Sequence, residues 1–408
     1  MSFIADPINF IARWLTAVLT GWGASASVTQ LILFIISAGL LAMGPLVFTI
    51  LLIWVERKIG GRFQDRLGPN RLGPWGIFQP IADMLKIFTK EYITPIGADK
   101  VPFNLAPILA VAAVLAVWAV IPLASTVYGV NLNVGAVYIL AVGALGELGF
   151  IMAGLGSNNK YAMLGGFRVV ANLISYEVPM VVILLIPIMF SGSLGMNDIA
   201  SSQTTWNVFL APLAALIFFI TQIAENARAP FDLIEADSEL VAGFNVEYSG
   251  LKFGFFYVAD FLHSATAALV FSTLFLGGWR GPGAETYPVL GFVYLVIKSA
   301  IIYFAILHIR FTIPRFRIDQ MMNFNWKFLT PLSLVVLVAT AVLDKLVPIG
   351  QTLLRVGVMW AANLLIWLIA DQIVKRVSKR QAVPEVAQPR PLARPPQVKT
   401  NDATGGEA

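Results

Sequence analysis

The feature that most constrains this chain is a series of apolar runs, each long enough to cross a lipid bilayer as a helix, which takes roughly 20 residues. Continuous runs of this kind predict helices, because lipid offers no hydrogen-bond partner to a free backbone. Of the 408 residues, 58% are hydrophobic and 12% are charged, which leaves little room for a soluble domain. The sequence therefore predicts an all-α polytopic membrane protein with about nine transmembrane helices. The expected spans are 29–55, 104–127, 136–157, 172–192, 207–224, 254–277, 286–310, 327–347 and 353–374.

The basic residues set the expected orientation, because lysine and arginine favour the cytoplasmic side of a membrane. With the N-terminus outside, most of the 28 lysines and arginines fall in cytoplasmic connections, and only Arg13, Arg280, Lys345 and Arg355 fall outside. These residues flank apolar runs instead of clustering on a soluble face, so we expect no nucleic acid as a partner. We expect a cytoplasmic C-terminus and cytoplasmic loops at 56–103, 158–171, 225–253 and 310–327.

The two ends of the chain differ from its centre. Residues 1–28 are expected to form an N-terminal interfacial segment, and residues 29–348 an eight-span core. The ninth span, 353–374, follows this core. Residues 378–408 contain several prolines and few apolar residues, which predicts a disordered, proline-rich cytoplasmic tail.

The longest polar stretch before the tail covers residues 56–91. It begins with Glu56, Arg57 and Lys58, directly after the first span. Gly-Pro pairs at 68–69 and 73–74 then force turns. From Gly76 onward, apolar residues recur with a helical period, which predicts a cytoplasmic amphipathic helix at the boundary between membrane and water.

The connection 225–253 is acidic, although the other connections on the same side are basic. Two interpretations are open: a cluster that collects protons and raises its own pKa values by mutual repulsion, or an ordinary solvated loop. Interleaved residues such as Pro230, Phe231 and Leu233 favour a loop that packs into a cavity. The acids are Glu225, Asp232, Glu235, Asp237, Glu239 and Glu247.

A third polar stretch, 309–328, carries Arg310, Arg315 and Arg317. Arginine forms two-pronged bonds with carboxylates, so these residues are suited to gripping acidic side chains or docking a protein partner at the membrane surface. The simpler interpretation is that they only anchor the cytoplasmic ends of two spans.

Charges inside spans are candidates for function, because each costs a few kcal/mol or more to bury in lipid. Glu147, Glu177, Asp260 and Lys298 fall within expected spans and suit a proton relay. The alternative for Lys298 is a structural pair with a glutamate. The histidines, His263 and His308, are expected to be satisfied polar groups and not metal ligands.

Cysteine is absent, and only two histidines occur. Iron–sulfur clusters need thiolate ligands, and structural zinc sites normally need four cysteine or histidine ligands. We therefore expect no metal site and no redox centre in this chain. Any electrons that it uses must come from a partner protein.

The polar stretches together resemble one family. The matching text is ERKIGGRFQDRLGPNRLGPWGIFQPIADMLKIFTKE, NNKYAMLGGFRVVANLISYEVP, ENARAPFDLIEADSELVAGFNVEY and PRFRIDQMMNFNWK, in the family's order and spacing over about 29–348. This pattern is similar to the family of the H-type membrane component of proton-pumping NADH:quinone oxidoreductase (respiratory complex I), the counterpart of mitochondrial NADH dehydrogenase subunit 1. The resemblance implies that the chain forms the quinone-access chamber and begins the proton path, with NADH and the iron–sulfur clusters held by partner subunits.

The same resemblance implies roles for particular residues. Quinone (ubiquinone or menaquinone) is the implied substrate, and Arg168 would face its passage from the loop before the fourth span. Partners would be the hydrophilic-arm subunits, the small adjacent membrane subunits and the lipid bilayer. The implied quinone-passage residues are Glu56, Arg57, Arg66, Asp83, Arg168 and Tyr257. The implied proton-relay residues are Glu147, Glu177, Glu225, Glu235, Asp237, Glu239, Glu247, Asp260 and Lys298. Arg310, Arg315 and Arg317 are the implied docking residues.

The chain also departs from the family's pattern. Asp237 stands where glutamate is usual, and Asn172 where glutamine is common. The ninth span and the tail extend past shorter members and suggest a bacterial protein of the plasma membrane. Two other classes stay open: the quinone-independent anchor component of a related membrane-bound hydrogenase, and a stand-alone ion transporter, although no paired halves with broken helices are visible.

Overall fold

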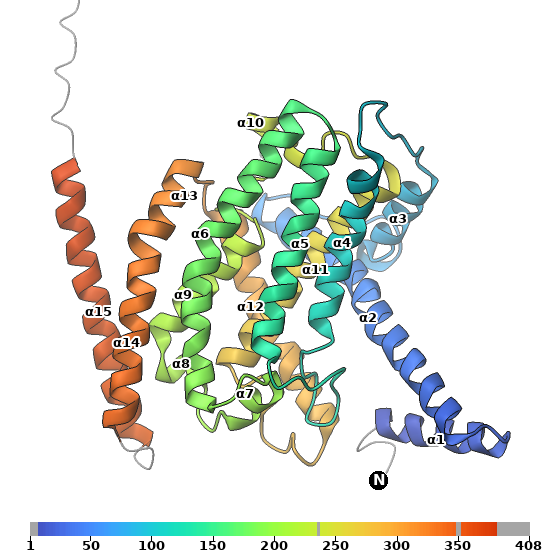
Figure 1. The fold of residues 1–408 in the computed structure, drawn as a ribbon, viewed down its shortest axis with the longest axis horizontal. Coiled ribbons are helices and arrows are strands. Elements are labelled where there is room, and N and C mark those ends of the chain that lie inside the picture. The colour runs from blue at the N-terminus through green and yellow to red at the C-terminus, as the bar shows by residue number, and fades with distance from the viewer. Residues whose placement is uncertain (1–6, 235–236, 348–351, 382–408) are drawn as a thin grey trace, which may run out of the picture. The chain divides into compact units, whose positions relative to one another are not determined.

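The structure is a computed structural model that describes residues 7–234, 237–347 and 352–381. This part of the chain is helical and contains no strand (Figure 1). Within these described ranges, eight helical segments are long and apolar enough to cross a membrane, so the chain is an all-α polytopic membrane protein, as predicted. They are α2 (Ala26–Phe63), α4 (Lys100–Trp118), α5 (Gly135–Gly156), α6 (Lys160–Ser191), α11 (Gly250–Phe275), α12 (Pro288–Thr312), the continuous segment Ile318–Leu346, and α15 (Thr352–Gln381).

The span expected at 207–224 is divided in two. It consists of α8 (Asn207–Leu210) and α9 (Pro212–Glu225), with Ala211 between them in a non-helical conformation. Helix α9 has 14 residues, about 21 Å at the usual rise of an α-helix. That length is shorter than the roughly 30 Å of a bilayer's hydrocarbon core. The count of nine spans therefore stays a prediction, and eight helical segments of the described chain meet the length and hydropathy expected of a span.

The loop expected at 158–171 is wrong from residue 160 onward, because α6 begins at Lys160. Asn159 caps this helix: its side-chain oxygen accepts a hydrogen bond from the Tyr161 backbone N–H at 2.9 Å. The amide nitrogen of Asn159 donates to Glu247 Oε1 at 2.7 Å. Glu247, which is distant in sequence, thus orients the capping residue. The local sequence carries no sign of this contact, so the start of the helix was predicted too late. Arg168 accordingly lies on a helix and not on a loop.

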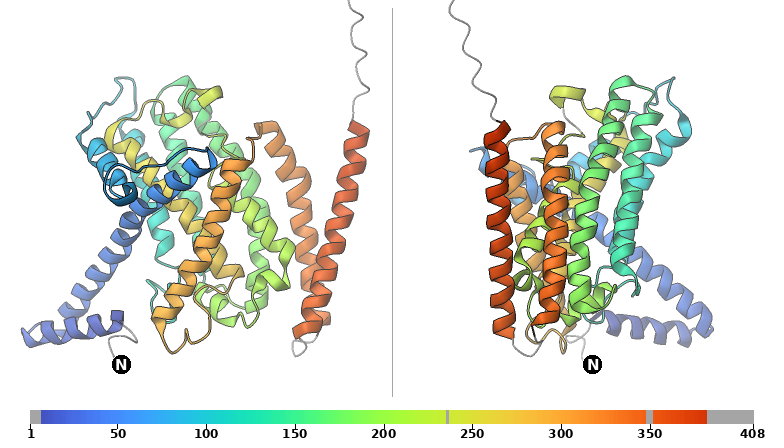
Figure 2. Two further views of the ribbon diagram at one scale, coloured as in Figure 1. Left: turned by 180° about the vertical axis from the view of Figure 1, so that it is seen from behind. Right: turned by 60° about the vertical axis from the view of Figure 1, so that its left-hand side comes forward.

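The shorter elements gather at the two ends of the bundle. Figures 1 and 2 show α3, α10 and α13 at one end, and α1 and α7 at the other. The three polar stretches of the sequence therefore share one end, as the expected topology requires. The remaining elements are α1 (Pro7–Gly21), η1 (Pro74–Gly76), α3 (Gln79–Thr89), α7 (Met196–Ser202), α10 (Asp237–Leu240), η2 (Gly243–Asn245), α13 (Ile318–Phe324), the π-helix η3 (Asn325–Leu329) and α14 (Thr330–Leu346).

Helix α11 lies at the centre of the packing. Within its apolar window 78% of the residues are buried, compared with at most 44% in the other spans. Small residues permit close contact between its neighbours α4 and α5: a Cβ on Gly149 would lie 2.9 Å from the Ala106 carbonyl oxygen. Such close backbone approach is the usual source of helix association in lipid, where the hydrophobic effect between helices is weak. Side chains on α11 are thus held in a rigid setting.

Residues up to Leu364 form one compact unit, and the residues after it form a second. The described part of the second unit, 365–381, is the C-terminal half of α15. This helix continues through residues 378–381, where the tail was expected to begin. The rest of the expected tail, 382–408, lies outside the described residues, as do residues 1–6 of the expected interfacial segment.

Candidate functional site

Glu56 is the centre of a buried ion-pair network. Its Oε2 atom accepts hydrogen bonds from Arg228 Nη1 at 2.7 Å and from the Tyr303 hydroxyl at 3.2 Å. Its Oε1 atom pairs with Arg310. Arg228 also donates from Nη2 to Asp260 Oδ2 at 2.8 Å. We call these residues the Glu56 cluster: Glu56, Arg228, Asp260, Tyr303 and Arg310.

Burial decides how strongly this cluster is held. The side chains of Arg228 and Glu56 are only 2% and 7% exposed. Arg228 is further covered by the Phe261 ring, whose centroid lies 5.2 Å from the guanidinium carbon. Charges taken out of water are costly unless paired, and pairing in a low-dielectric setting is correspondingly strong. Each charged side chain of this network therefore depends on the others to offset the cost of burying its charge.

The local backbone explains how these side chains reach one another. Helix α2 continues to Phe63, past the expected end of the first span, so Glu56 lies within the helix and is buried. Helix α9 ends at Glu225, and Ala227 has a φ of 49°, which turns the chain back toward the bundle. The turn is fixed by the Phe231 N–H, which donates to the Arg228 carbonyl at 2.8 Å. Arg228 is thereby directed inward.

A second polar group lies at the end of α9. His263 Nε2 is 3.6 Å from Glu225 Oε1, and Gln222 Nε2 donates to Glu225 Oε2 at 2.6 Å. We call Gln222, Glu225 and His263 the Glu225 cluster. A Cβ on Gly143 of α5 would lie 3.2 Å from Glu225 Oε1, so the glycine makes room for this carboxylate.

Glu147 lies on α5 close to the same region. It is 5% exposed, and its Oε1 atom accepts a hydrogen bond from the Tyr176 hydroxyl at 3.4 Å. Glu177 follows Tyr176 on α6 and is half-buried. The two carboxylates that were predicted within the third and fourth spans thus lie on helices, and Glu147 is the more deeply buried.

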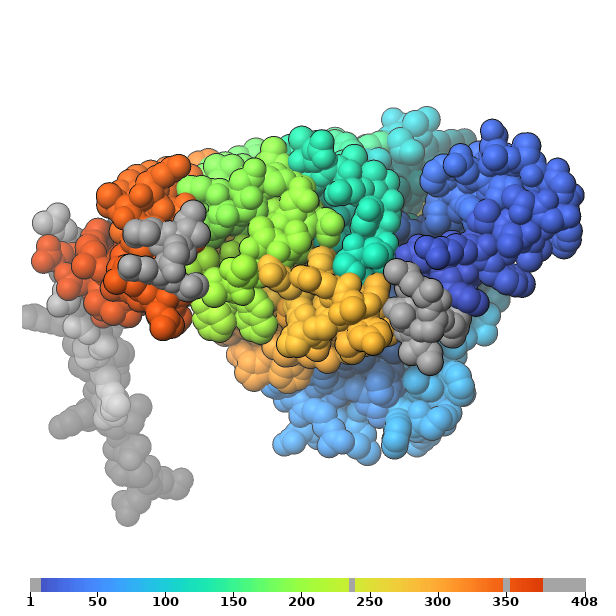
Figure 3. All heavy atoms as spheres, turned by 90° about the horizontal axis from the view of Figure 1, so that it is seen from below, coloured from blue at the N-terminus to red at the C-terminus, as the bar shows by residue number. Residues whose placement is uncertain are grey.

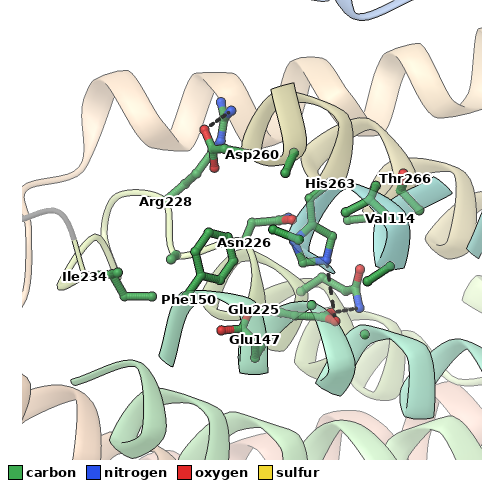
Figure 4. A pocket seen from close by; sticks show the side chains of 18 of the residues that line it. Val114, Glu147, Phe150, Glu225, Asn226, Arg228, Ile234, Asp260, His263 and Thr266 are labelled. Carbon is green, nitrogen blue, oxygen red and sulfur yellow. Dashed lines mark hydrogen bonds and ion pairs between the residues drawn. The ribbon is translucent and has the colours of Figure 1, made fainter. Parts of the chain in front are cut away.

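A single cavity joins the two clusters (Figure 4). Its volume is about 90 Å³. Glu147, Glu225 and His263 line it together with Arg228 and Asp260. Apolar side chains of α4, including Ala113 and Val114, form much of the remaining wall. The arrangement places groups that can take up or release protons around one cavity between the helices.

The first polar stretch forms a compact structure at the end of α2. Arg57 pairs with Asp83 of α3, and Lys86 Nζ lies 3.5 Å from the same carboxylate. Partial burial would raise the pKa of Asp83, but the hydrogen bond and charge of Arg57, helped by Lys86, hold it below its usual value. Asp83 thus stays charged and ties α3 to α2. Arg66 is exposed, and its Nε donates to Gln64 at 2.7 Å.

The acidic connection is tied to two other stretches through Glu239. Arg168 Nη1 donates to Glu239 Oε2 at 2.6 Å, and Arg315 Nη2 lies 3.7 Å from Oε1. The hydrogen bond from Arg168, with the charges of Arg168, Arg315 and Arg317, lowers the pKa of Glu239. The link is solvent-exposed, so it orders the connection without adding much stability.

We expect Glu239→Gln to lower stability by less than about 1 kcal/mol at neutral pH, because exposed ion pairs contribute little. A lowered pKa means that the stabilisation is complete above the usual value of 4.5 and is lost as the pH falls through the lower folded value. Wild type and variant should therefore become equally susceptible to proteolysis of the 225–253 connection in strong acid. A difference that persists there would contradict the role of the charge, and Glu91→Gln, an exposed acid, serves as the control.

Lys298 is held by backbone carbonyls and not by the glutamate that the structural alternative required. Its ammonium donates to the carbonyl oxygens of Leu276, Gly278 and Arg280 at 2.7, 2.9 and 2.8 Å. These carbonyls belong to the end of α11 and the connection after it, which Figure 3 shows in gold beside the green α7 region. Lys298 thus satisfies the carbonyl of Leu276, the C-cap of α11, and ties the connection after this helix to α12.

The other predicted residues are spread around the end of the bundle that holds α3, α10 and α13. Tyr257 is 44% exposed on α11 and packs against Phe253, with ring centroids 4.7 Å apart. The Arg317 backbone N–H donates to Gln320 at the start of α13. Arg310 does grip a carboxylate, one of the two functions considered for its stretch. Glu235 lies outside the described residues, and so does the side chain of Asp237.

Three ionisable residues of the two clusters were not singled out as candidates from the sequence. Arg228 lies in the acidic connection but was not among the candidates, His263 was expected to be a satisfied polar group, and Tyr303 carried no signal. His263 lies one helical turn from Asp260 on α11, so the two polar side chains share one face of the helix. This spacing was the available signal. Asn226, between Glu225 and Arg228, also lines the cavity.

No group of three or more histidine, aspartate or glutamate side chains in the described ranges is placed to hold a metal ion. The fold and the two clusters define a multi-pass helical membrane protein that encloses ion pairs between its helices. A family model described as NADH dehydrogenase matches residues 35–341. The chain belongs to this NADH dehydrogenase family.

Several relatives are similar over most of their length, and each is named as the H subunit of NADH-quinone oxidoreductase. The protein from Dehalococcoides mccartyi strain CBDB1 is 44% identical over 328 residues, which cover 80% of this chain and 90% of the relative. That of Rhodospirillum centenum is 43% identical over 75% of this chain and 93% of its own. That of Geobacillus sp. strain WCH70 is 41% identical over 79% and 97%.

Proposed function

We propose that this chain is the membrane subunit of a bacterial NADH:quinone oxidoreductase that forms the quinone passage and begins the proton path. One observation carries the proposal: the three polar stretches that carry the family resemblance meet at Glu56. Glu56 belongs to the first stretch, Arg228 to the acidic connection and Arg310 to the third stretch. Stretches that are far apart in sequence thus build one buried charged site.

The proposed partners follow from the names of the relatives and from the chemistry of the chain. The relatives are named as subunits of NADH-quinone oxidoreductase. Reduction of quinone to quinol takes up electrons and protons, and a chain without cysteine cannot hold the iron–sulfur cluster that would supply the electrons. We assign that cluster, and NADH binding, to docked soluble subunits, and the neighbouring contacts to small membrane subunits.

Quinone would approach along the cytoplasmic end of the bundle. The residues proposed to frame its passage are on α2, α3, α6 and α11, and the charged ones are fixed by partners: Asp83 by Arg57, and Arg168 by Glu239. Exposed apolar side chains of α3, including Ile81 and Phe88, suit contact with lipid or with an isoprenoid tail. The proposed passage residues are Glu56, Arg57, Arg66, Asp83, Arg168 and Tyr257.

The proton path would start where the passage meets the cavity. Arg228 bonds both Glu56 and Asp260, so a change in the charge of Asp260 alters the hold of Arg228 on Glu56. The cavity then brings His263, Glu225 and Glu147 within reach of the same change. The proposed relay residues are Glu147, Glu177, Glu225, Glu235, Asp237, Glu239, Glu247, Asp260 and Lys298. For Lys298 the support is the resemblance alone, since its described partners are carbonyls.

The proposed setting is the bacterial plasma membrane, with the N-terminus outside and the C-terminus in the cytoplasm. The support is the distribution of basic residues together with the common end of the bundle that holds α3, α10 and α13 (Figure 1). At that end Arg315 and Arg317 are proposed to dock the soluble subunits. Arg310 is largely occupied by Glu56, so its part in docking is secondary.

A photoreactive quinone with a short isoprenoid tail tests the proposed passage. In isolated membranes, we expect illumination to attach the probe to peptides from residues 56–89 or from the first turns of α11. An excess of unmodified quinone should suppress this labelling, while labelling of lipid-exposed helices such as α15 should be unaffected by the competitor. If the labelling that excess quinone suppresses were found only on other subunits, the assignment of the passage to this chain would be contradicted.

A further inference from the structure

Asn226 is buried, and its side chain has no hydrogen-bond partner in the part of the chain that the structure describes. It follows Glu225 at the end of α9 and is 3% exposed. Neither its amide oxygen nor its amide nitrogen bonds any group among the described residues, and the same holds for Arg228 Nε. Leaving such a group unpaired is costly, and buried polar atoms in native proteins nearly always have a partner, often an ordered water.

These three atoms belong to residues that line the cavity between the two clusters. Asn226 and Arg228 both contribute to its wall, with Glu225 and His263 toward one side and Asp260 toward the other (Figure 4). The cavity volume is about 90 Å³, well above the roughly 10–15 Å³ that one water needs. A water in such a site needs two to four polar partners, roughly, and the wall supplies them.

We propose that Asn226 and Arg228 Nε bind ordered water in this cavity, and that this water connects the Glu225 cluster to the Glu56 cluster. The amide of Asn226 both donates and accepts, so it can orient one water by its oxygen and another by its nitrogen. It does not titrate, so it fixes the water without retaining a proton. Asn226 is therefore a positioning residue. This inference rests on the proposed function, because it supplies the connection that the proton path requires.

The geometry favours water over other occupants. The polar atoms come from both ends of the cavity, whereas the apolar wall of α4 between them offers no hydrogen bond. A small polar molecule that both donates and accepts suits these walls, and an isoprenoid segment would leave Asn226 unsatisfied. Waters that are hydrogen-bonded between carboxylate and imidazole groups can pass a proton by accepting one hydrogen and donating another, whereas the guanidinium, which stays charged, only orients them.

A density map of the intact complex, purified from native membranes and resolved well enough to show ordered water, tests the site directly. We expect water within about 2.7–3.2 Å of an Asn226 amide atom and of Arg228 Nε. Continuous apolar density in the cavity, such as lipid or a quinone tail, would overturn the proposal. So would an Asn226 amide bonded to protein groups on both of its polar atoms.

Variants test whether the water matters. Asn226→Leu keeps the approximate size but removes both polar atoms. We expect NADH-driven quinone reduction to fall about tenfold to a hundredfold, the range for a misplaced reacting group, and the solvent isotope effect in heavy water to increase because proton transfer becomes limiting. Asn226→Gln, which retains the amide, should keep most of the rate. Asn363→Leu replaces another buried asparagine, on α15 and away from the cavity, and should change neither quantity.

The outcomes separate this inference from the proposed function. A wild-type rate and isotope effect in an assembled Asn226→Leu complex, alongside a Glu225→Gln complex that has lost activity, would overturn the water site and leave the proposed function in place. Quinone reduction that survives deletion of this chain would overturn the proposed function itself. If Asn226→Leu does not assemble on a native gel, the wild-type density map decides the question.

Discussion

Replacing Arg228 with methionine is expected to lower the free energy of unfolding by about 3–5 kcal/mol, as for other buried ion pairs that lose one partner. Methionine fills much of the same volume but leaves the buried carboxylate of Glu56 with fewer partners and Asp260 without its 2.8 Å contact. The measurement is the fraction of chain that remains folded in the purified complex after heating, read from the loss of helical circular dichroism.

Three further variants locate the cause of that loss. Arg228→Lys keeps the charge but cannot bond two carboxylates with one planar group, so its stability should be intermediate. Adding Glu56→Gln to Arg228→Met removes the poorly paired carboxylate and should restore part of the stability. Arg71→Met, at an exposed position, is the matched control and should melt like the wild type. Equal melting of Arg228→Met and Arg71→Met would show that the Glu56 cluster does not stabilise the fold.

Replacing Glu225 with glutamine is expected to reduce NADH-driven quinone reduction about a hundredfold or more, the usual contribution of a positioned proton-transfer group. The substitution preserves the size and the contact with Gln222, but it removes the charge that faces His263 at 3.6 Å. Because glutamine cannot carry a proton between the cavity and its neighbours, the proposed path would be interrupted. The measurement is the rate of quinone reduction in isolated membranes, normalised to assembled complex on a native gel.

Two controls make the Glu225 result interpretable. Electron flow from NADH to a water-soluble artificial acceptor should stay at the wild-type level, because the proposed function assigns that route to the docked soluble subunits. Glu285→Gln, an exposed carboxylate in the connection between α11 and α12, should leave quinone reduction unchanged. A wild-type rate in Glu225→Gln would remove this residue from the path and would shift attention to Glu147.

Much of the architecture follows from the sequence, because lipid imposes a strict length and polarity on a span. The helical class was predicted on that basis and is confirmed, and eight of the nine expected spans coincide with described helical segments that are long and apolar enough to cross a membrane. The exception is 207–224, where the described helix is short. The errors arise where a distant contact decides the local structure. Asn159 starts α6 with the help of Glu247, which is 88 positions away, so residues 160–171 are helical where a loop was expected.

Part of the site was also predictable from the polarity that lipid imposes on a span. Glu147, Glu225 and Asp260 could be singled out because a charge in or beside a span is costly and calls for an explanation. What the sequence does not contain is which charges meet. The pairing of Glu56 with Arg228 joins residues 172 positions apart, and that with Arg310 joins residues 254 positions apart. Lys298 was singled out for the same reason, but its ammonium bonds three backbone carbonyls and no charged group in the described structure.

The most direct test of the central claim records quinone reduction and proton uptake together in inverted membrane vesicles. The claim is that the cavity between the Glu56 and Glu225 clusters links the two processes. Wild-type and Glu285→Gln vesicles should reduce quinone and acidify their interior when NADH is added. Glu225→Gln vesicles with a normal amount of assembled complex should lose both responses and keep electron flow to the artificial acceptor. Quinone reduction and acidification at wild-type levels in Glu225→Gln vesicles would contradict the account.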